Sequence, residues 1–100
     1  MFGLSETVIN DICGVFEKHP NIKEVVLFGS RAKGNYSEGS DIDLAIKEGD
    51  VSFNQLMDIN IQIEDLELLY KVDVVNYSER IGTPIAEHID RVGKKFYLRK

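Results

Sequence analysis

Residues 26–46 read VLFGSRAKGNYSEGSDIDLAI, and this stretch contains two predicted strands separated by a turn and a loop. The apolar, Val-rich run at 22–28 predicts the first strand. The residues that follow, 29–33, predict a short helical turn, and the polar residues 34–39 predict a loop. At 41–47 apolar side chains occupy every second position, which is typical of a strand with one buried face.

Helix caps and apolar spacing predict the remaining elements. These are a helix from the Ser5 cap to about Lys18, a long helix from the Ser52 cap to about Tyr70, a strand at 71–76, a helix from the Thr83 cap to Gly93, and an edge strand at 96–98. The order is helix, strand, strand, helix, strand, helix, strand. It predicts an α/β (α+β) fold in which helices pack on a small mixed β-sheet.

Length and composition limit the classes of function. One hundred residues is a length for a single domain, expected at 1–100. The 17 acidic and 12 basic residues give a net charge of -5, which disfavours a nucleic acid partner. No apolar run approaches the roughly 20 residues of a membrane span, and no signal peptide is evident. One cysteine, Cys13, allows no internal disulfide. We therefore expect a cytoplasmic protein without a membrane partner.

Three aspartates are the candidate metal ligands. Asp41 and Asp43 are two residues apart on a predicted strand, so both carboxylates leave the same face of the sheet. Aspartate is depleted in strands, and like charges on one face repel unless a cation lies between them. Asp73 occupies the predicted strand at 71–76. If the two strands are neighbours, three carboxylates converge and suit a pair of Mg²⁺ ions.

The turn at Gly29-Ser30 is the candidate phosphate site. It follows a strand and opens a helical turn, so backbone N–H groups point toward an incoming anion. Glycine allows a phosphate to approach the backbone, and the Ser30 hydroxyl can donate to a phosphate oxygen. A triphosphate held at this turn, with metal ions at the acids, would be positioned for attack on its α-phosphate.

This stretch resembles the signature of the DNA polymerase β nucleotidyltransferase superfamily. Gly29-Ser30, ten intervening residues and Asp41-x-Asp43 match its pattern without departure, and Asp73 stands where the family has its third acid. The chain is most similar to the minimal nucleotidyltransferases, which form toxin–antitoxin pairs with HEPN-domain proteins. The resemblance implies an antitoxin that transfers AMP from ATP to a tyrosine of a HEPN ribonuclease toxin and forms a hetero-oligomer with it.

The resemblance also implies roles for individual residues. Asp41 and Asp43 would bind two Mg²⁺ ions, and Asp73 would bind the catalytic ion and help to deprotonate the acceptor hydroxyl. Gly29 and Ser30 would hold the β- and γ-phosphates, and Ser40 would add a second phosphate contact. For Arg31 two roles stay open, because a guanidinium suits either the triphosphate or a nearby carboxylate that would brace the turn.

Two other functions remain open at this level. The chain could neutralise a partner by occlusion, without catalysis, since the wide apolar coverage of the helix that begins after Ser52 favours an interaction surface. Transfer to a small molecule is the weaker alternative, because relatives with that activity carry an additional substrate-binding region. Both histidines, His19 and His88, are expected at the surface. The sequence does not specify the base of the nucleotide, the acceptor or the number of nucleotides added.

Overall fold

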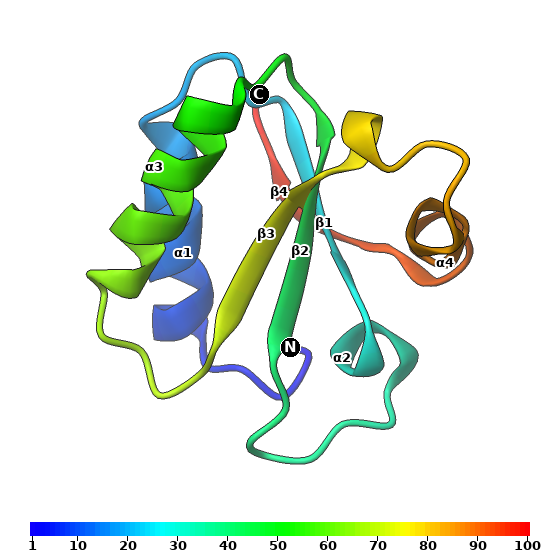
Figure 1. The fold of residues 1–100 in the computed structure, drawn as a ribbon. Helices are drawn as coiled ribbons and strands as arrows, with labels where there is room; N and C mark the ends of the chain where they lie inside the picture. Colours follow the sequence, from blue (N-terminus) through cyan, green and yellow to red (C-terminus); the bar gives the residue numbers. More distant parts are fainter.

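The computed structural model describes residues 1–100 and contains one mixed sheet of four strands in the order β3-β2-β1-β4 (Figure 1). The strands are β1 (Glu24–Phe28), β2 (Ile42–Glu48), β3 (Val72–Asn76) and β4 (Lys94–Leu98). Strand β1 is antiparallel to both β2 and β4, whereas β2 and β3 are parallel. The predicted fold class is confirmed, and β3 and β4 are the two edge strands.

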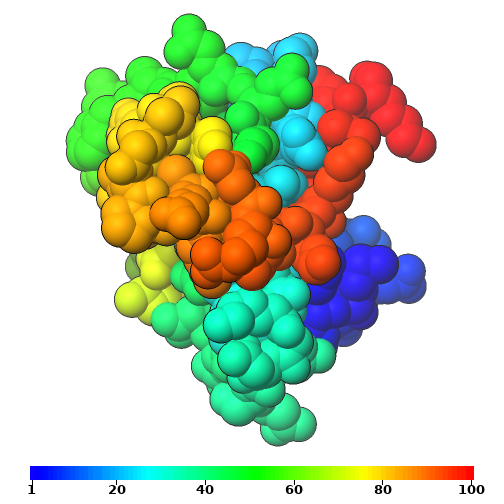
Figure 2. Space-filling view, turned by 90° about the vertical axis from the view of Figure 1, so that its right-hand side faces the viewer, coloured from blue at the N-terminus to red at the C-terminus, as the bar shows by residue number.

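Helices cover both faces of this sheet (Figure 1). On one face lie α1 (Glu6–Glu17) and α3 (Phe53–Glu64), and on the other lies α4 (Pro84–Val92). The short helix α2 (Ser30–Lys33) follows β1, and the 3-10 helix η1 (Tyr77–Glu79) follows β3. Figure 2 views the molecule from the side of α4, and the segment that contains α2 protrudes below that helix. None of the helices has the length and apolar character that crossing a bilayer requires.

The alternation in β2 separates two apolar clusters. Ile42, Leu44 and Ile46 are fully buried in the main core of 16 residues, which includes the inner sides of α1 and α3. The residues between them face α4, where Ala45 packs with Ile89 in a second, smaller cluster. The main core therefore holds the sheet from one side, and Asp43 opens toward the side on which α4 lies.

The predicted helix starts are confirmed by their caps. The Ser5 hydroxyl accepts from the Val8 N–H at 3.2 Å, and the Ser52 hydroxyl accepts from the Gln55 N–H at 3.1 Å. Thr83 caps α4 in the same way and is followed by Pro84. A side-chain oxygen at this position satisfies an N–H that has no partner within the helix.

The predicted end of the long helix is wrong. Helix α3 ends at Glu64 instead of continuing to Tyr70, and Glu67 adopts a left-handed conformation with φ of 54°. Glu64, Asp65 and Glu67 place negative charge at the negative end of the helix dipole, where it is unfavourable. These acids therefore surround a helix terminus. Tyr70 still packs on the main core, from an irregular segment.

Candidate active site

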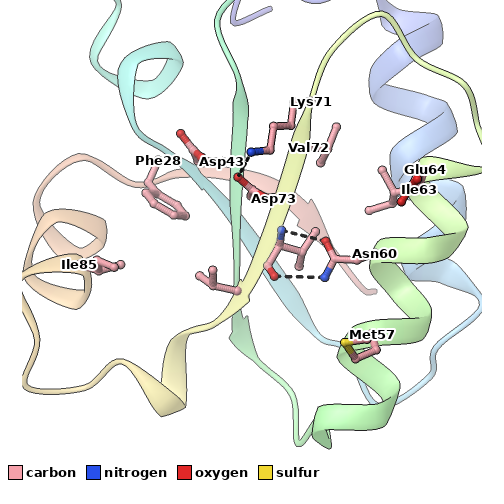
Figure 3. A pocket seen from close by; sticks show the side chains of 12 residues that line it. Phe28, Asp43, Met57, Asn60, Ile63, Glu64, Lys71, Val72, Asp73 and Ile85 are labelled. Carbon is pink, nitrogen blue, oxygen red and sulfur yellow. Dashed lines mark hydrogen bonds and ion pairs between the residues drawn. The ribbon is translucent and has the colours of Figure 1, made fainter.

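The three aspartates meet on the side of the sheet that faces α4. Asp43 on β2 is the register partner of Asp73 on β3, and Asp41 immediately precedes β2. Side chains of register partners on adjacent strands leave the same face of the sheet. The predicted adjacency of Asp73 to the other two acids is therefore confirmed. Figure 3 shows Asp43 and Asp73 on their neighbouring strands.

Negative charge is crowded at this position. The pKa of Asp43 is raised, first by burial and then by the carboxylates of Asp73 and Asp41. His88 and Lys71 offset this in part, and the Lys71 ammonium lies 4.0 Å from an Asp73 carboxylate oxygen. A divalent cation would relieve the repulsion that remains, and carboxylate oxygens are the ligands that Mg²⁺ prefers.

The acids fit Mg²⁺ in type and in placement, but they are not arranged as a finished metal site. No group of three or more His, Cys, Asp or Glu side chains is positioned so that it could hold a metal ion as it stands. Asp41 and Asp73 are exposed, so their side chains can reorient at little cost. The backbone therefore brings the three carboxylates to one side of the sheet, and their relative positions can still change by side-chain rotation.

Gly29 lies directly against the acids. Its backbone has φ of 75°, a conformation that residues with a Cβ rarely adopt, and a Cβ built there would collide with the Asp43 carboxylate. Glycine is thus required twice, by the turn that links β1 to α2 and by the nearby side chain. Ser30 follows as the first residue of α2. The predicted phosphate turn and the predicted acids therefore form one site.

His88 is a member of this site that sequence reasoning missed. The Gly29 N–H donates to His88 Nε2 at 3.3 Å, and the imidazole packs edge-on against Phe28 with ring centroids 6.2 Å apart. His88 is half-exposed, in line with the expectation of a surface residue, but α4 folds back over the end of β1 and brings its imidazole to the Gly29 amide. Fifty-nine positions separate the two bonded residues, and no local pattern signals such a contact.

His19 is also held by hydrogen bonds, although away from the acids. Its Nε2 lies 3.0 Å from the side-chain oxygen of Gln62, and its Nδ1 lies 3.0 Å from the side-chain nitrogen of Gln55. These contacts join the end of α1 to α3, and His19 is half-exposed, in line with the expectation of a surface residue. The role of His19 is structural.

An ion pair holds α4 in the position that brings His88 to the site. The Lys47 ammonium on β2 lies 2.7 Å from an Asp90 carboxylate oxygen on α4, and the Tyr77 hydroxyl donates to the same oxygen at 2.7 Å. The hydrogen bond from Lys47 is the main reason why the pKa of Asp90 is lowered. The contact thus links α4 to the central part of the sheet.

Arg31 is turned away from solvent and from the acids. The side chain is only 2% exposed, and its three guanidinium nitrogens donate to the backbone carbonyls of Phe2, Glu38 and Ser40 at 2.9 to 3.1 Å. The guanidinium also lies over the rings of Tyr36 and Tyr70, 5.1 and 4.9 Å from their centroids. These contacts favour the bracing role for Arg31, with carbonyls in place of the carboxylate that the sequence suggested.

Ser40 and Tyr36 serve the same loop. The Ser40 hydroxyl accepts from the Ser37 N–H at 2.9 Å and closes a turn just before Asp41. Tyr36 stacks on Arg31, as described above. The contact of Ser40 with a phosphate stays a prediction.

A cavity of about 740 Å³ adjoins the acids and extends around the edge strand β3 (Figure 3). Asp43, Asp73 and Phe28 line it on one side of β3, and Met57 and Asn60 of α3 line it on the other. The Asn60 side chain donates to the Val74 carbonyl at 3.3 Å and accepts from the Val74 N–H at 3.2 Å. It satisfies the free backbone edge of β3 and leaves the cavity open beside the acids.

Comparisons with known proteins agree with this geometry. The pattern of the polymerase beta nucleotidyltransferase family matches residues 10–100. The chain is 53% identical over 38 residues to an inferred protein adenylyltransferase of Methanocaldococcus jannaschii, and this match covers 38% of the chain and 37% of the relative. The aligned part thus spans well under half of that protein.

Solved structures share the fold. A toxin–antitoxin with AMP-PNP superposes with a TM-score of 0.70 at 22% identity, over 92% of this chain and 74% of the other. The toxin–antitoxin MntA-HepT gives 0.67 at 19% identity, over 95% of this chain and 74% of the other. The family pattern spans both the phosphate turn and all three aspartates. The chain therefore belongs to the polymerase beta nucleotidyltransferase family.

Proposed function

We propose that this chain is a metal-dependent nucleotidyltransferase that moves AMP from ATP to a hydroxyl group of a partner protein. The observation that carries the proposal is the pairing of Asp43 with Asp73 across β2 and β3, beside Asp41 and against the turn at Gly29. Crowded carboxylates next to a half-buried backbone turn offer ligands for cations and for phosphates at one place.

Each residue of the site has a distinct task in this proposal. Gly29 and Ser30 hold the β- and γ-phosphates, and Asp41, Asp43 and Asp73 hold two Mg²⁺ ions. When bound, Mg²⁺ offsets the negative charge of the triphosphate and of the departing pyrophosphate. Gly29 lies next to the Asp43 side chain, so the phosphate turn is beside the acids.

Asp73 lines the open cavity together with Asp43 and is the proposed proton acceptor. The acceptor hydroxyl gives its proton to the Asp73 carboxylate while its oxygen bonds to the α-phosphorus. The bond from that phosphorus to the β-phosphate oxygen breaks, and pyrophosphate leaves. The position of Asp73 on an edge strand favours this role, because an acceptor group can approach from outside the sheet.

The proposed acceptor is a tyrosine of a HEPN ribonuclease toxin, and the chain would be the antitoxin of that pair. The name of the Methanocaldococcus relative supports protein adenylylation, and the two superposed structures are toxin–antitoxin complexes. The net charge of -5 supports a protein acceptor over a nucleic acid.

The test begins with the neighbouring gene, where we expect a HEPN-type reading frame. Its product is incubated with this chain, ATP and Mg²⁺, and the intact product is analysed by mass spectrometry. We expect mass increases of one or more AMP units with the wild-type chain. Asp43→Ala and Asp73→Ala are expected to abolish them, whereas Asp11→Ala, an exposed acid on α1, should leave them unchanged. Absence of label with the wild-type chain would refute the proposal.

Occlusion without catalysis is the second candidate, and exposed apolar side chains on α3 favour it. The two candidates separate in a growth assay with the toxin co-expressed. Loss of protection with Asp41→Ala and Asp43→Ala supports catalysis. Full protection by these variants supports occlusion.

A further inference from the structure

The outer face of α3 carries an exposed apolar stripe. Phe53, Met57 and Ile61 are 65%, 49% and 51% exposed, and their spacing of four residues places them along one side of the helix. Below we call these three residues the α3 stripe. Contiguous apolar side chains on a surface mark interaction sites more often than single exposed ones do.

The surroundings of the α3 stripe are acidic. From Glu48 to Tyr70 the chain has no lysine or arginine, and it contains the acids Glu48, Asp50, Asp58, Glu64, Asp65 and Glu67. Three of these acids follow one another at the end of α3. Apart from Lys71, which lines the adjoining cavity beside its partner Asp73, the charges of this segment are negative. An apolar centre with a predominantly negative rim is complementary to a surface with an apolar centre and a positive rim. It is unsuited to anionic lipid, which the same charges repel.

The α3 stripe is continuous with the candidate active site. Met57 belongs to the stripe and also lines the cavity that contains Asp43 and Asp73. In Figure 3, Met57 and Asn60 on α3 lie across β3 from these acids. A protein seated on the stripe could therefore extend a side chain over the edge of β3 toward the proposed proton acceptor.

We propose that the α3 stripe is the docking surface for the acceptor protein, which binds it through an apolar patch rimmed by lysine and arginine. The inference rests on the proposed function and deepens it, because it assigns the surface that selects the protein acceptor. Apolar contact supplies the affinity, and the opposite charges orient the acceptor protein and accelerate its association.

The test compares two substitutions with the same exposure. Ile61 on the stripe and Leu98 on the opposite sheet edge are each 51% exposed, so Ile61→Glu and Leu98→Glu place a charge in equivalent solvent contact. The probe is the HEPN-type protein that we expect from the neighbouring gene, titrated by calorimetry. We expect at least tenfold weaker binding with Ile61→Glu, wild-type affinity with Leu98→Glu, and binding by the wild-type chain that weakens as salt increases.

Additional readouts separate the docking proposal from the proposed function. ATP–Mg²⁺ binding and thermal unfolding of both variants should match those of the wild-type chain. Equal binding by Ile61→Glu and the wild-type chain would overturn the docking proposal even if the acceptor is still adenylylated. Selective loss of binding with Ile61→Glu upholds docking even if no AMP is transferred. No binding by the wild-type chain, or a change only in self-association of Ile61→Glu, would also overturn it.

Discussion

Replacement of Arg31 by alanine tests the internal support of the active-site loop. Arg31 joins three segments, because its guanidinium donates to the carbonyls of Phe2, Glu38 and Ser40. Ser40 directly precedes the first metal-ligand candidate, Asp41. The variant should therefore lose stability and should also loosen the start of β2.

The magnitude follows from the three hydrogen bonds. A hydrogen bond to a charged group contributes about 1.5–3 kcal/mol. Glu38 is exposed and Ser40 is half-buried, so water can hydrogen-bond to the carbonyls that lose Arg31. The contributions of the three hydrogen bonds will therefore not add in full. We expect Arg31→Ala to lower the free energy of unfolding by about 2–4 kcal/mol. At about 4–8 °C per kcal/mol for a chain of this size, the melting temperature should fall by about 8–32 °C.

Thermal unfolding by circular dichroism and ATP–Mg²⁺ titration calorimetry together decide the role of Arg31. Lys33→Ala is the matched control, because Lys33 is a cation of the same short helix but is exposed. We expect that control to change the free energy of unfolding by less than about 0.5 kcal/mol. If Arg31→Ala melted like the wild-type chain and bound ATP tenfold more weakly, Arg31 would be a phosphate ligand and the bracing role would be refuted.

Three further substitutions probe the site. Asp43→Asn should raise the melting temperature of the metal-free chain at neutral pH, because the raised pKa of Asp43 means that its charged form opposes folding. The gain in melting temperature should shrink as the pH falls through that raised pKa toward the usual 3.8. A gain that stays constant with pH would contradict this. His88→Ala should bind ATP–Mg²⁺ about two to ten times more tightly by calorimetry, because the Gly29 N–H is then free of its hydrogen bond to the imidazole. The control His19→Ala should bind ATP–Mg²⁺ like the wild-type chain. Weaker binding by His88→Ala would mean that His88 contacts the nucleotide itself. Asn60→Ala should lower the free energy of unfolding, measured in urea, by about 1–3 kcal/mol, because the N–H and C=O of Val74 lose their hydrogen-bond partner. An unchanged midpoint of urea unfolding would argue against this contact at the edge of β3.

Local chemistry explains why most elements were predictable. Each helix start depends on a capping Ser or Thr, whose hydroxyl accepts a hydrogen bond from the backbone N–H three residues later. The alternation of buried and less buried side chains in β2 depends only on neighbouring residues. The end of α3 was predicted six residues too late, since apolar spacing continues beyond Glu64 to Tyr70. Those apolar side chains do pack on the core, but they do so from an irregular segment. Apolar periodicity alone does not distinguish such a segment from a continued helix.

The sequence by itself determined the composition of the site. Gly29-Ser30 and the pair Asp41 and Asp43 are close along the chain, so a turn and one strand suffice to present them together. Only the tertiary structure decided what joins them. The register of β2 with β3 brings Asp73 beside Asp43, and the return of α4 brings His88 to the amide of Gly29.

The burial of Arg31 and the exposure of the α3 stripe were likewise decided by packing. The sequence identifies a cation and an apolar helix, but it does not show which face of each is covered. The contact of Arg31 with Phe2 joins residues 29 positions apart, and the covering of each face depends on the packing of the whole sheet and its helices. A sequence pattern records which residues can make a contact, and the fold selects the partners that they meet.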